Sequence, residues 1–268
     1  MNFRVDVTII GDSKAGHEIL DKIASAKPAI KLAFISQAFK DTTFHDYNNV
    51  KYFRDEVEYV SYRHKLFCCY LKNGDNVFST HLVVASGVNY EPYAINGKEL
   101  FGVLNSLDYV TKSAKDQYAV VLGSQESDAK FAYDVAKKYK HVYFSSQDVN
   151  IVENISSAVS KKLTSAENIT VLPNTSIKNV ITNNGAVSKI VLDNYSEIDC
   201  SAVYAKTSST PAIDFVPRKI ISREDGYPAV KDNCESTLVP GCFAAGNCLK
   251  KYTKSMEQRL IESISKDF

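Results

Sequence analysis

Two stretches of the chain repeat the same succession of a buried strand, a tight turn and an amphipathic helix. In the first stretch, apolar residues form a strand over residues 4–10, a glycine-bounded turn covers 11–16, and apolar side chains recur near helical spacing over 16–26. A second, largely apolar segment, residues 30–35, is typical of a strand buried on both faces of a parallel sheet. This pattern predicts a βαβ unit.

The second stretch begins with an apolar strand over residues 118–122 and continues through a helix from about 126 to 139. It returns in a strand over 142–145. The chain is therefore predicted to hold two Rossmann-like units.

The regions after each unit read as antiparallel strands. Residues 57–62 and 66–72 are rich in β-forming residues, and Asn73-Gly74 is a type I′ turn signal that leads to a further strand at 77–78. A second Asn-Gly pair, Asn184-Gly185, joins residues 176–182 to 187–192, ahead of a strand at 200–205. Each Rossmann-like unit is thus expected to carry a small antiparallel sheet.

Composition narrows the classes of function. The chain has 268 residues, 44% of them hydrophobic, and a net charge of +1, so it can bury a sizeable core and has no electrostatic reason to bind nucleic acid or an anionic membrane. No apolar run approaches the ~20 residues that span a bilayer, and the start does not resemble a signal peptide. We expect a cytoplasmic protein with no membrane or nucleic-acid partner.

The cysteines and histidines form no recognisable metal or catalytic pattern. Six cysteines include no Cys-x-x-Cys pair, so reduced and mostly buried thiols are expected. They are Cys68, Cys69, Cys200, Cys234, Cys242 and Cys248. The five histidines are scattered, with no His-x-x-x-His spacing. No catalytic residue and no metal ligand is predicted.

Three segments resemble the thioredoxin reductases and related flavoproteins with two dinucleotide-binding domains. Residues 238–247, LVPGCFAAGN, resemble the closing flavin-binding segment of that family, and 82–87, LVVASG, resemble its strand ending in Ala-Thr-Gly. Residues 203–211 resemble the stretch that re-enters the FAD domain. The resemblance implies an α/β protein of two three-layer (ββα) Rossmann-like domains, the second inserted in the first. An FAD-binding-like domain would cover residues 1–108 and 210–268, and an NAD(P)-binding-like domain 109–209.

The resemblance also implies positions for FAD. They are Gly11, Ser13, Gly16, Ser86, Gly87, Gly246 and Asn247. The first phosphate loop keeps both outer glycines of GxGxxG and has serine in the middle, and a β-branched side chain at Gly11 is expected to fill the space for phosphate. Asn247 stands where the family has an aspartate that holds the ribityl chain.

Other positions depart from the family's FAD pattern. Ser36 and Gln37 stand where an acid would bind the ribose, so the charge-assisted hydrogen bond is lost. The stretch 39–50 is short for the family, and 252–255, YTKS, replace an Arg-Gln-Ala that faces the flavin. FAD binding stays an alternative.

The family's NADPH-binding motif and its redox cysteine pair are less well preserved than the FAD motif. The loop 122–127, LGSQES, has Leu122 at the first glycine and Glu126 at the helix start, where a carboxylate can cap the helix but would repel pyrophosphate. Residues 145–147, SSQ, replace the arginines that read a 2′-phosphate, and 105–108, NSLD, replace the cysteine pair. We therefore expect no NADPH binding in the family's manner.

Two hypotheses of function follow. The leading one is a degenerate family member, a pseudoenzyme without disulfide reductase activity that acts as a binding or structural protein. A partner protein, or a second copy of the chain in a homodimer, would suit that role. The alternative is an FAD-dependent oxidoreductase with a non-standard electron donor.

Overall fold

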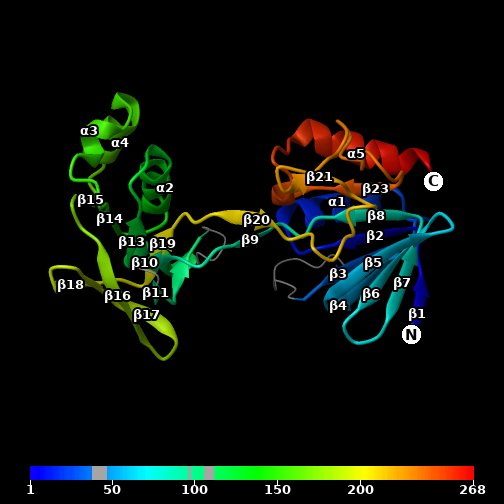
Figure 1. Ribbon diagram of the computed structural model, residues 1–268, viewed down its shortest axis with the longest axis horizontal. Helices are drawn as coiled ribbons and strands as arrows, with labels where there is room; N and C mark the ends of the chain where they lie inside the picture. Colours follow the sequence, from blue (N-terminus) through cyan, green and yellow to red (C-terminus); the bar gives the residue numbers. More distant parts are fainter. Residues whose placement is uncertain (38–46, 96–97, 106–111) are drawn as a thin grey trace. The chain divides into compact units, whose positions relative to one another are not determined.

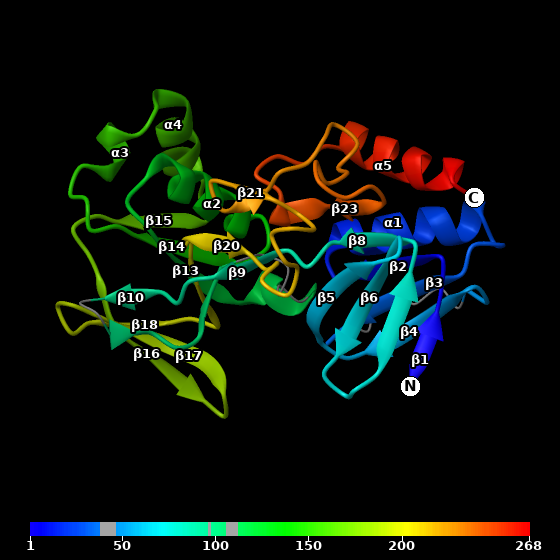
Figure 2. The ribbon, with the colours of Figure 1, turned by 45° about the vertical axis from the view of Figure 1, so that its right-hand side comes forward.

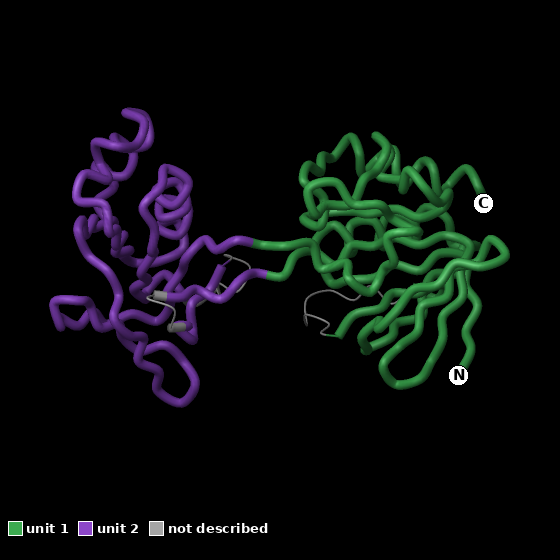
Figure 3. The backbone as a smooth tube through the Cα atoms, in the orientation of Figure 1, with its two compact units in different colours: residues 1–89, 209–268 green, residues 90–208 purple. Residues whose placement is uncertain are grey.

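The computed structural model describes residues 1–37, 47–95, 98–105 and 112–268. The chain forms two compact units, residues 1–89 with 209–268 and residues 90–208 (Figure 3). Unit 2 is thus an insertion in unit 1. The prediction of an α/β protein with two Rossmann-like units is confirmed.

Unit 1 is built on a five-stranded sheet in which all neighbours are parallel. In spatial order its strands are β23 (Cys242–Ala244), β8 (His81–Val84), β2 (Val7–Ile10), β3 (Leu32–Ser36) and β4 (Val50–Arg54). Every residue of the central strands β8, β2 and β3 is buried. These strands are covered on both faces, which explains why they read as continuous apolar runs.

Two further layers cover this sheet. Helices α1 (Lys14–Ala26) and α5 (Lys254–Lys266) pack against each other on one face (Figures 1 and 2). The second layer is a four-stranded sheet of β1 (Asn2–Arg4), β7 (Asn76–Ser79), β6 (Leu66–Leu71) and β5 (Val57–Arg63). One apolar core joins the layers. The result is the expected three-layer ββα arrangement.

The N-terminal segment differs from its prediction. Residues 4–10 do not form one strand, because the chain leaves β1 in the four-stranded sheet, where it pairs with β7 in parallel, and enters β2 in the five-stranded sheet. Asp6 marks the change: its carboxylate accepts a hydrogen bond from Lys31 N at 2.7 Å and its carbonyl accepts one from His81 N at 3.0 Å. These bonds hold Asp6 between the two layers.

The first Asn-Gly turn also differs from its prediction. Only Gly74 of the Asn73-Gly74 pair has a positive φ, whereas a type I′ turn needs positive φ at both residues. Asn73 instead accepts a hydrogen bond from Asp75 N through its side chain at 2.8 Å. Asn184 and Gly185 do both have positive φ, at 50° and 80°.

Unit 2 repeats the layered plan. Its parallel sheet contains β12 (Val103–Leu104), β19 (Ala202–Ala205), β13 (Tyr118–Leu122), β14 (His141–Ser145) and β15 (Ile169–Leu172). Helices α2 (Glu126–Ala136), α3 (Ile151–Asn154) and α4 (Ser157–Ser165) lie on one face. The other face carries β16 (Ile177–Asn183), β17 (Ala186–Leu192) and β18 (Glu197–Asp199). Val121 packs toward the helices, and Val120 and Leu122 pack toward the antiparallel strands.

Short elements complete the description. They are β9 (Val88–Tyr90), β10 (Ala94–Ile95), β11 (Lys98–Glu99), η2 (Lys112–Asp116), β20 (Ser209–Pro211), β21 (Arg223–Glu224), β22 (Tyr227–Pro228) and η3 (Gly246–Cys248).

The first boundary between the units lies at residues 89 and 90 rather than near 108, because β12 pairs with β19 in the sheet of unit 2. In the described part of the chain, no helix combines the length and the apolar character needed to cross a membrane.

Candidate functional site

The first glycine-bounded loop joins β2 to α1 in unit 1. Gly11 has φ +111°, and a Cβ there would lie 2.4 Å from the carbonyl oxygen of Ala85, at the end of β8. A Cβ on Gly16 would lie 2.5 Å from the carbonyl oxygen of Gly11. Both glycines are therefore required by close backbone packing. The space that a side chain at Gly11 would enter belongs to the β8 segment and not to a ligand, contrary to the expectation from sequence.

Ser13, in the middle of this loop, caps α1. Its hydroxyl oxygen accepts a hydrogen bond from Gly16 N at 3.1 Å, and its φ of −79° is ordinary extended backbone, so serine fits without strain. The next two backbone N–H groups, of Lys14 and Ala15, have no acceptor within the helix. They leave a positive helix end that favours an anion.

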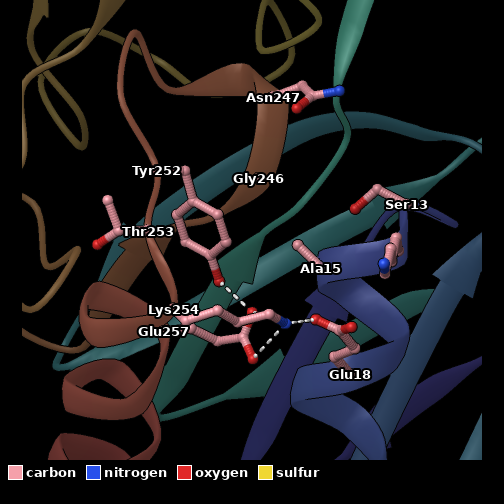
Figure 4. A pocket seen from close by; sticks show the side chains of 10 residues that line it. Ser13, Ala15, Glu18, Gly246, Asn247, Tyr252, Thr253, Lys254 and Glu257 are labelled. Atoms are coloured by element: carbon pink, nitrogen blue, oxygen red, sulfur yellow. Dashed lines mark hydrogen bonds and ion pairs between the residues drawn. The ribbon is translucent and has the colours of Figure 1, made fainter. Parts of the chain in front are cut away.

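A pocket of about 240 Å³ opens at this helix end (Figure 4). It is lined by Ser13, Lys14, Ala15, Glu18, Gly246, Asn247, Tyr252, Thr253, Lys254 and Glu257. Thr253 caps α5 by accepting a hydrogen bond from Met256 N at 3.3 Å. The N-terminal ends of two helices therefore border one pocket, and both favour negative charge in it.

A buried carboxylate lies beside the pocket. The Glu257 side chain is 1% exposed; it accepts hydrogen bonds from Lys22 Nζ at 2.8 Å and from the Tyr252 hydroxyl at 3.1 Å. Lys254 pairs with both Glu257 and Glu18, which connects α5 to α1. Burial opposes ionisation of Glu257, but the hydrogen bond and charge of Lys22 outweigh it and keep the pKa below its ordinary value.

The predicted FAD positions divide into three groups. Ser13, Gly246 and Asn247 line the pocket, while Gly11 and Gly16 shape the loop behind it. Ser86 and Gly87 do not line it. They bind the returning chain instead: the Ser86 hydroxyl donates to Ala212 O at 2.6 Å, and Gly87 O accepts from Ala212 N at 3.0 Å.

Glu18 and Glu257 were not among the residues predicted for the site. No spacing in the sequence could have revealed Glu257, because its partner Lys22 is 235 positions away. The N-cap signal at Thr253 could only have placed the start of the helix that carries it.

The pocket fits part of FAD. The Gly11 turn, the free N–H groups of α1 and Gly246, with φ +77°, suit a diphosphate. The volume is below the ~300–1,000 Å³ of a complete small-molecule site. At the ribose position Ser36 is buried at the end of β3 and Gln37 is exposed. Of the short stretch 39–50, residues 39–46 lie outside the described residues.

In the corresponding loop of unit 2, a side chain of the protein itself accepts hydrogen bonds from the backbone N–H groups. Leu122 is the last residue of β13, so it needs no positive φ. From the sequence, the Glu126 carboxylate is expected at the helix start, but Glu126 accepts a hydrogen bond from Ser156 N at 2.9 Å and pairs with Lys130. The Asp128 carboxylate takes that place, accepting hydrogen bonds from Ser124 N and Gln125 N. These residues do not fit a dinucleotide phosphate.

All six thiols are buried and unpaired with one another. Burial raises the pKa of every one of them, to about 12 for Cys200, Cys234 and Cys248. At the position of the family's dithiol, Asn105 accepts a hydrogen bond from Thr207 Oγ1 at 3.2 Å, and residues 106–108 lie outside the described part. Among the described residues, no three His, Cys, Asp or Glu side chains are grouped to hold a metal ion.

Comparisons with known proteins identify the family. The family model for pyridine nucleotide-disulphide oxidoreductases matches residues 6–246. No curated protein matches the chain. The thioredoxin reductase of Streptococcus pyogenes MGAS5005 is similar in structure, with a TM-score of 0.67 at 16% identity over 100% of both chains. The thioredoxin reductases of Lactococcus lactis (TM-score 0.67, 15% identity) and T. acidophilum (TM-score 0.64, 16% identity) are similar over 98% of both chains. The chain therefore belongs to the pyridine nucleotide-disulphide oxidoreductase family, with a thioredoxin-reductase-like fold.

Proposed function

We propose that this chain does not reduce disulfides with NADPH, and that it is a binding protein whose ligand site is the pocket of unit 1. The observation that carries the first part is the state of the thiols. Disulfide reduction needs an accessible thiolate as nucleophile, whereas all six thiols here are buried and have raised pKa values. No cysteine is therefore prepared to attack a substrate disulfide.

The pocket of unit 1 supports the second part of the proposal. The starts of α1 and α5 both border it and favour negative charge there, and Lys14 adds a cation to its lining. Glu18 and Glu257 are neutralised by Lys254 and Lys22. A small molecule with a phosphate group is the ligand class that this balance favours.

An electron-transfer assay tests the loss of reductase activity. Purified protein supplied with NADPH and either thioredoxin or a small aromatic disulfide is expected to release no thiol above the rate without protein. An active thioredoxin reductase in the same assay is the positive control. A variant in which all six cysteines are serine separates thiol chemistry from background, and a rate that this variant abolishes would refute the proposal, provided that it stays folded.

A second candidate function is an FAD-dependent oxidoreductase with an electron donor other than NADPH. The retained backbone of Gly11, Gly16 and Gly246 favours it, since each has the close packing or positive φ that a dinucleotide loop needs. Ser13, Gly246 and Asn247 would hold the diphosphate and the adjoining chain. When bound, the flavin would supply the capacity to accept and pass on electrons.

Absorbance separates the two candidates. Protein carrying FAD is yellow and releases the nucleotide on denaturation. Colourless protein whose Tm does not rise when FAD is added supports the binding-protein proposal, since a ligand specific for the native state must stabilise it.

A further inference from the structure

We infer that the Asp128 carboxylate permanently occupies the phosphate position of the loop in unit 2, as an anion built into the chain. Asp128 Oδ2 accepts hydrogen bonds from Ser124 N at 3.1 Å and from Gln125 N at 3.0 Å. The Ser127 hydroxyl donates to Oδ1 at 3.3 Å. Two backbone N–H groups of the loop and one hydroxyl from the first turn of α2 thus converge on one carboxylate.

These donors lie in the loop between β13 and α2. The loop follows β13, the central strand of the parallel sheet, and leads into α2, which has 11 residues. In a βαβ unit, this strand-to-helix turn is where backbone N–H groups receive a pyrophosphate. Asp128 therefore uses the same donors that a dinucleotide would need.

Packing shows that the side chain also fills the space. Asp128 is only 8% exposed. A Cβ placed on Gly123 would lie 2.3 Å from the Cβ, Cγ and Oδ2 atoms of Asp128, so the carboxylate rests directly on the backbone of the loop. A phosphate cannot approach Gly123 while this side chain stays in place.

The segment after β14 supports the closed state of the loop. The Ser146 hydroxyl donates to Ser124 Oγ at 3.2 Å and accepts from Asp148 N at 3.1 Å. The Asp148 carboxylate is itself held by Asn150 N and Asn154 Nδ2. A ligand with phosphate groups would therefore meet the Asp128 carboxylate at a loop whose N–H donors are already used and whose Ser124 side chain is held by the segment after β14.

The carboxylate has a thermodynamic advantage over any free anion. It lies within the first turn of α2, where negative charge is favoured, and it is tethered to the donors that it binds. A free phosphate would have to displace it and leave a buried carboxylate without partners. Unit 2 is thus closed to phosphate-bearing ligands in the native protein, and removal of the carboxylate should open it.

Pyrophosphate binding tests this inference. The full chain and its Asp128→Ala, Asp128→Asn and Asp134→Ala variants are compared by thermal unfolding with and without inorganic pyrophosphate, at constant ionic strength. Each carries Ser13→Asp as well, to silence the loop of unit 1. Asp134 lies on the same helix but is exposed, so Asp134→Ala is the matched control.

Only Asp128→Ala is expected to gain pyrophosphate binding. Its Tm should rise by roughly 2–4 °C at a few times the Kd, while Asp128→Asn, which keeps the volume of the side chain, and Asp134→Ala should not respond. A folded Asp128→Ala variant that shows no gain over the parent chain overturns the inference.

A measurement on the unmodified chain covers the case in which Asp128→Ala does not fold. The amide signals of Ser124 and Gln125 are followed by NMR as pyrophosphate is added. We expect no change at either amide, and a saturable shift there overturns the inference. Signals of Lys14 and Ala15 report separately on the pocket of unit 1, so the two proposals can fail independently.

Discussion

The strand-to-helix loops of the two units have the same place in the fold and opposite electrostatic surroundings. In unit 1 the cap is the neutral Ser13, which uses Gly16 N and leaves the first N–H groups of α1 directed to a pocket. In unit 2 the Asp128 carboxylate accepts from the loop itself. We therefore propose that one side chain near the start of each helix decides whether the loop can receive a ligand anion.

The buried carboxylates of the two units sharpen this difference. Glu257 of unit 1 lies on the neighbouring helix α5 and is neutralised by Lys22 and Lys254. Asp128 of unit 2 is instead satisfied by hydrogen bonds from backbone N–H groups of the loop, and within the described residues it forms no ion pair with a lysine. A buried acid beside a phosphate loop leaves room for a bound anion only when lysines satisfy the acid. An acid that uses the loop N–H groups competes with the anion for the same donors.

The largest effect is expected for Gly11→Val, as a loss of folding rather than of ligand affinity. The variant combines a strained φ of +111° with a Cβ overlapping the backbone at Ala85, so we expect at least ~3 kcal/mol of lost stability. Urea unfolding measures it. Gly74→Ala, at φ +87° with open space around the Cβ, is the control and should cost only about 1 kcal/mol. Equal losses in the two variants would contradict the packing argument.

Glu257→Gln should lower the free energy of unfolding by about 1–2 kcal/mol at pH 7. Lys22 and Lys254 are exposed enough to be rehydrated, which keeps the loss below that of a fully buried ion pair. Because the pKa of Glu257 is lowered in the folded protein, its stabilisation is complete at neutral pH. It disappears as the pH falls through that lowered pKa, below the ordinary value of 4.5.

The measurement is thermal or urea unfolding of both proteins across this pH range. The difference in the free energy of unfolding between the two proteins should shrink in acid. A difference that grows in acid would show that the pKa of Glu257 is raised in the folded protein rather than lowered. Glu262→Gln, an exposed acid on the same helix, is the control and should show little difference at any pH.

Substitutions at Ser13 separate capping from ligand binding. Ser13→Ala loses the cap of α1 and should cost about 1 kcal/mol. Ser13→Asp keeps the cap, yet it places in unit 1 a carboxylate like that of unit 2. We expect unchanged stability and at least ~10-fold weaker binding of FAD or any other phosphate ligand found in the pocket. Calorimetric titration of both variants measures the affinity, and tight binding by a folded Ser13→Asp protein would move the site elsewhere.

The smallest effect is expected for Glu126→Gln. Hydrogen bonds from Lys130 and Ser156 hold the pKa of Glu126 at about 2, but the pair is exposed and screened by solvent. The Tm should change by less than about 2 °C, and less than in Asp128→Asn. A larger Tm change in Glu126→Gln than in Asp128→Asn would show that Glu126 is the carboxylate at the helix start, as its sequence position suggested.

Much of the fold followed from local sequence. Strand β13 was predicted with the bounds 118–122 that it has, and α1 and α2 were predicted where they occur, although α2 ends earlier, at Ala136. Burial of one face or both faces of an element leaves a periodic pattern of apolar residues in the sequence. This pattern can be read without knowing which other element packs against it. Gly11 and Gly16 were recognised for the same reason, since a tight strand-to-helix turn demands glycine locally.

Tertiary structure decided which groups meet. Residues 4–10 were divided between two sheets because Asp6 bonds to Lys31 and His81, both distant in sequence. Glu257 met Lys22 only through the packing of α5 on α1. At the start of α2, two acids lie two positions apart, and the side-chain direction and the nearby Ser156 selected Asp128 for the loop. Sequence determines which charges lie near a helix end, whereas three-dimensional packing determines which of them the N–H groups bind.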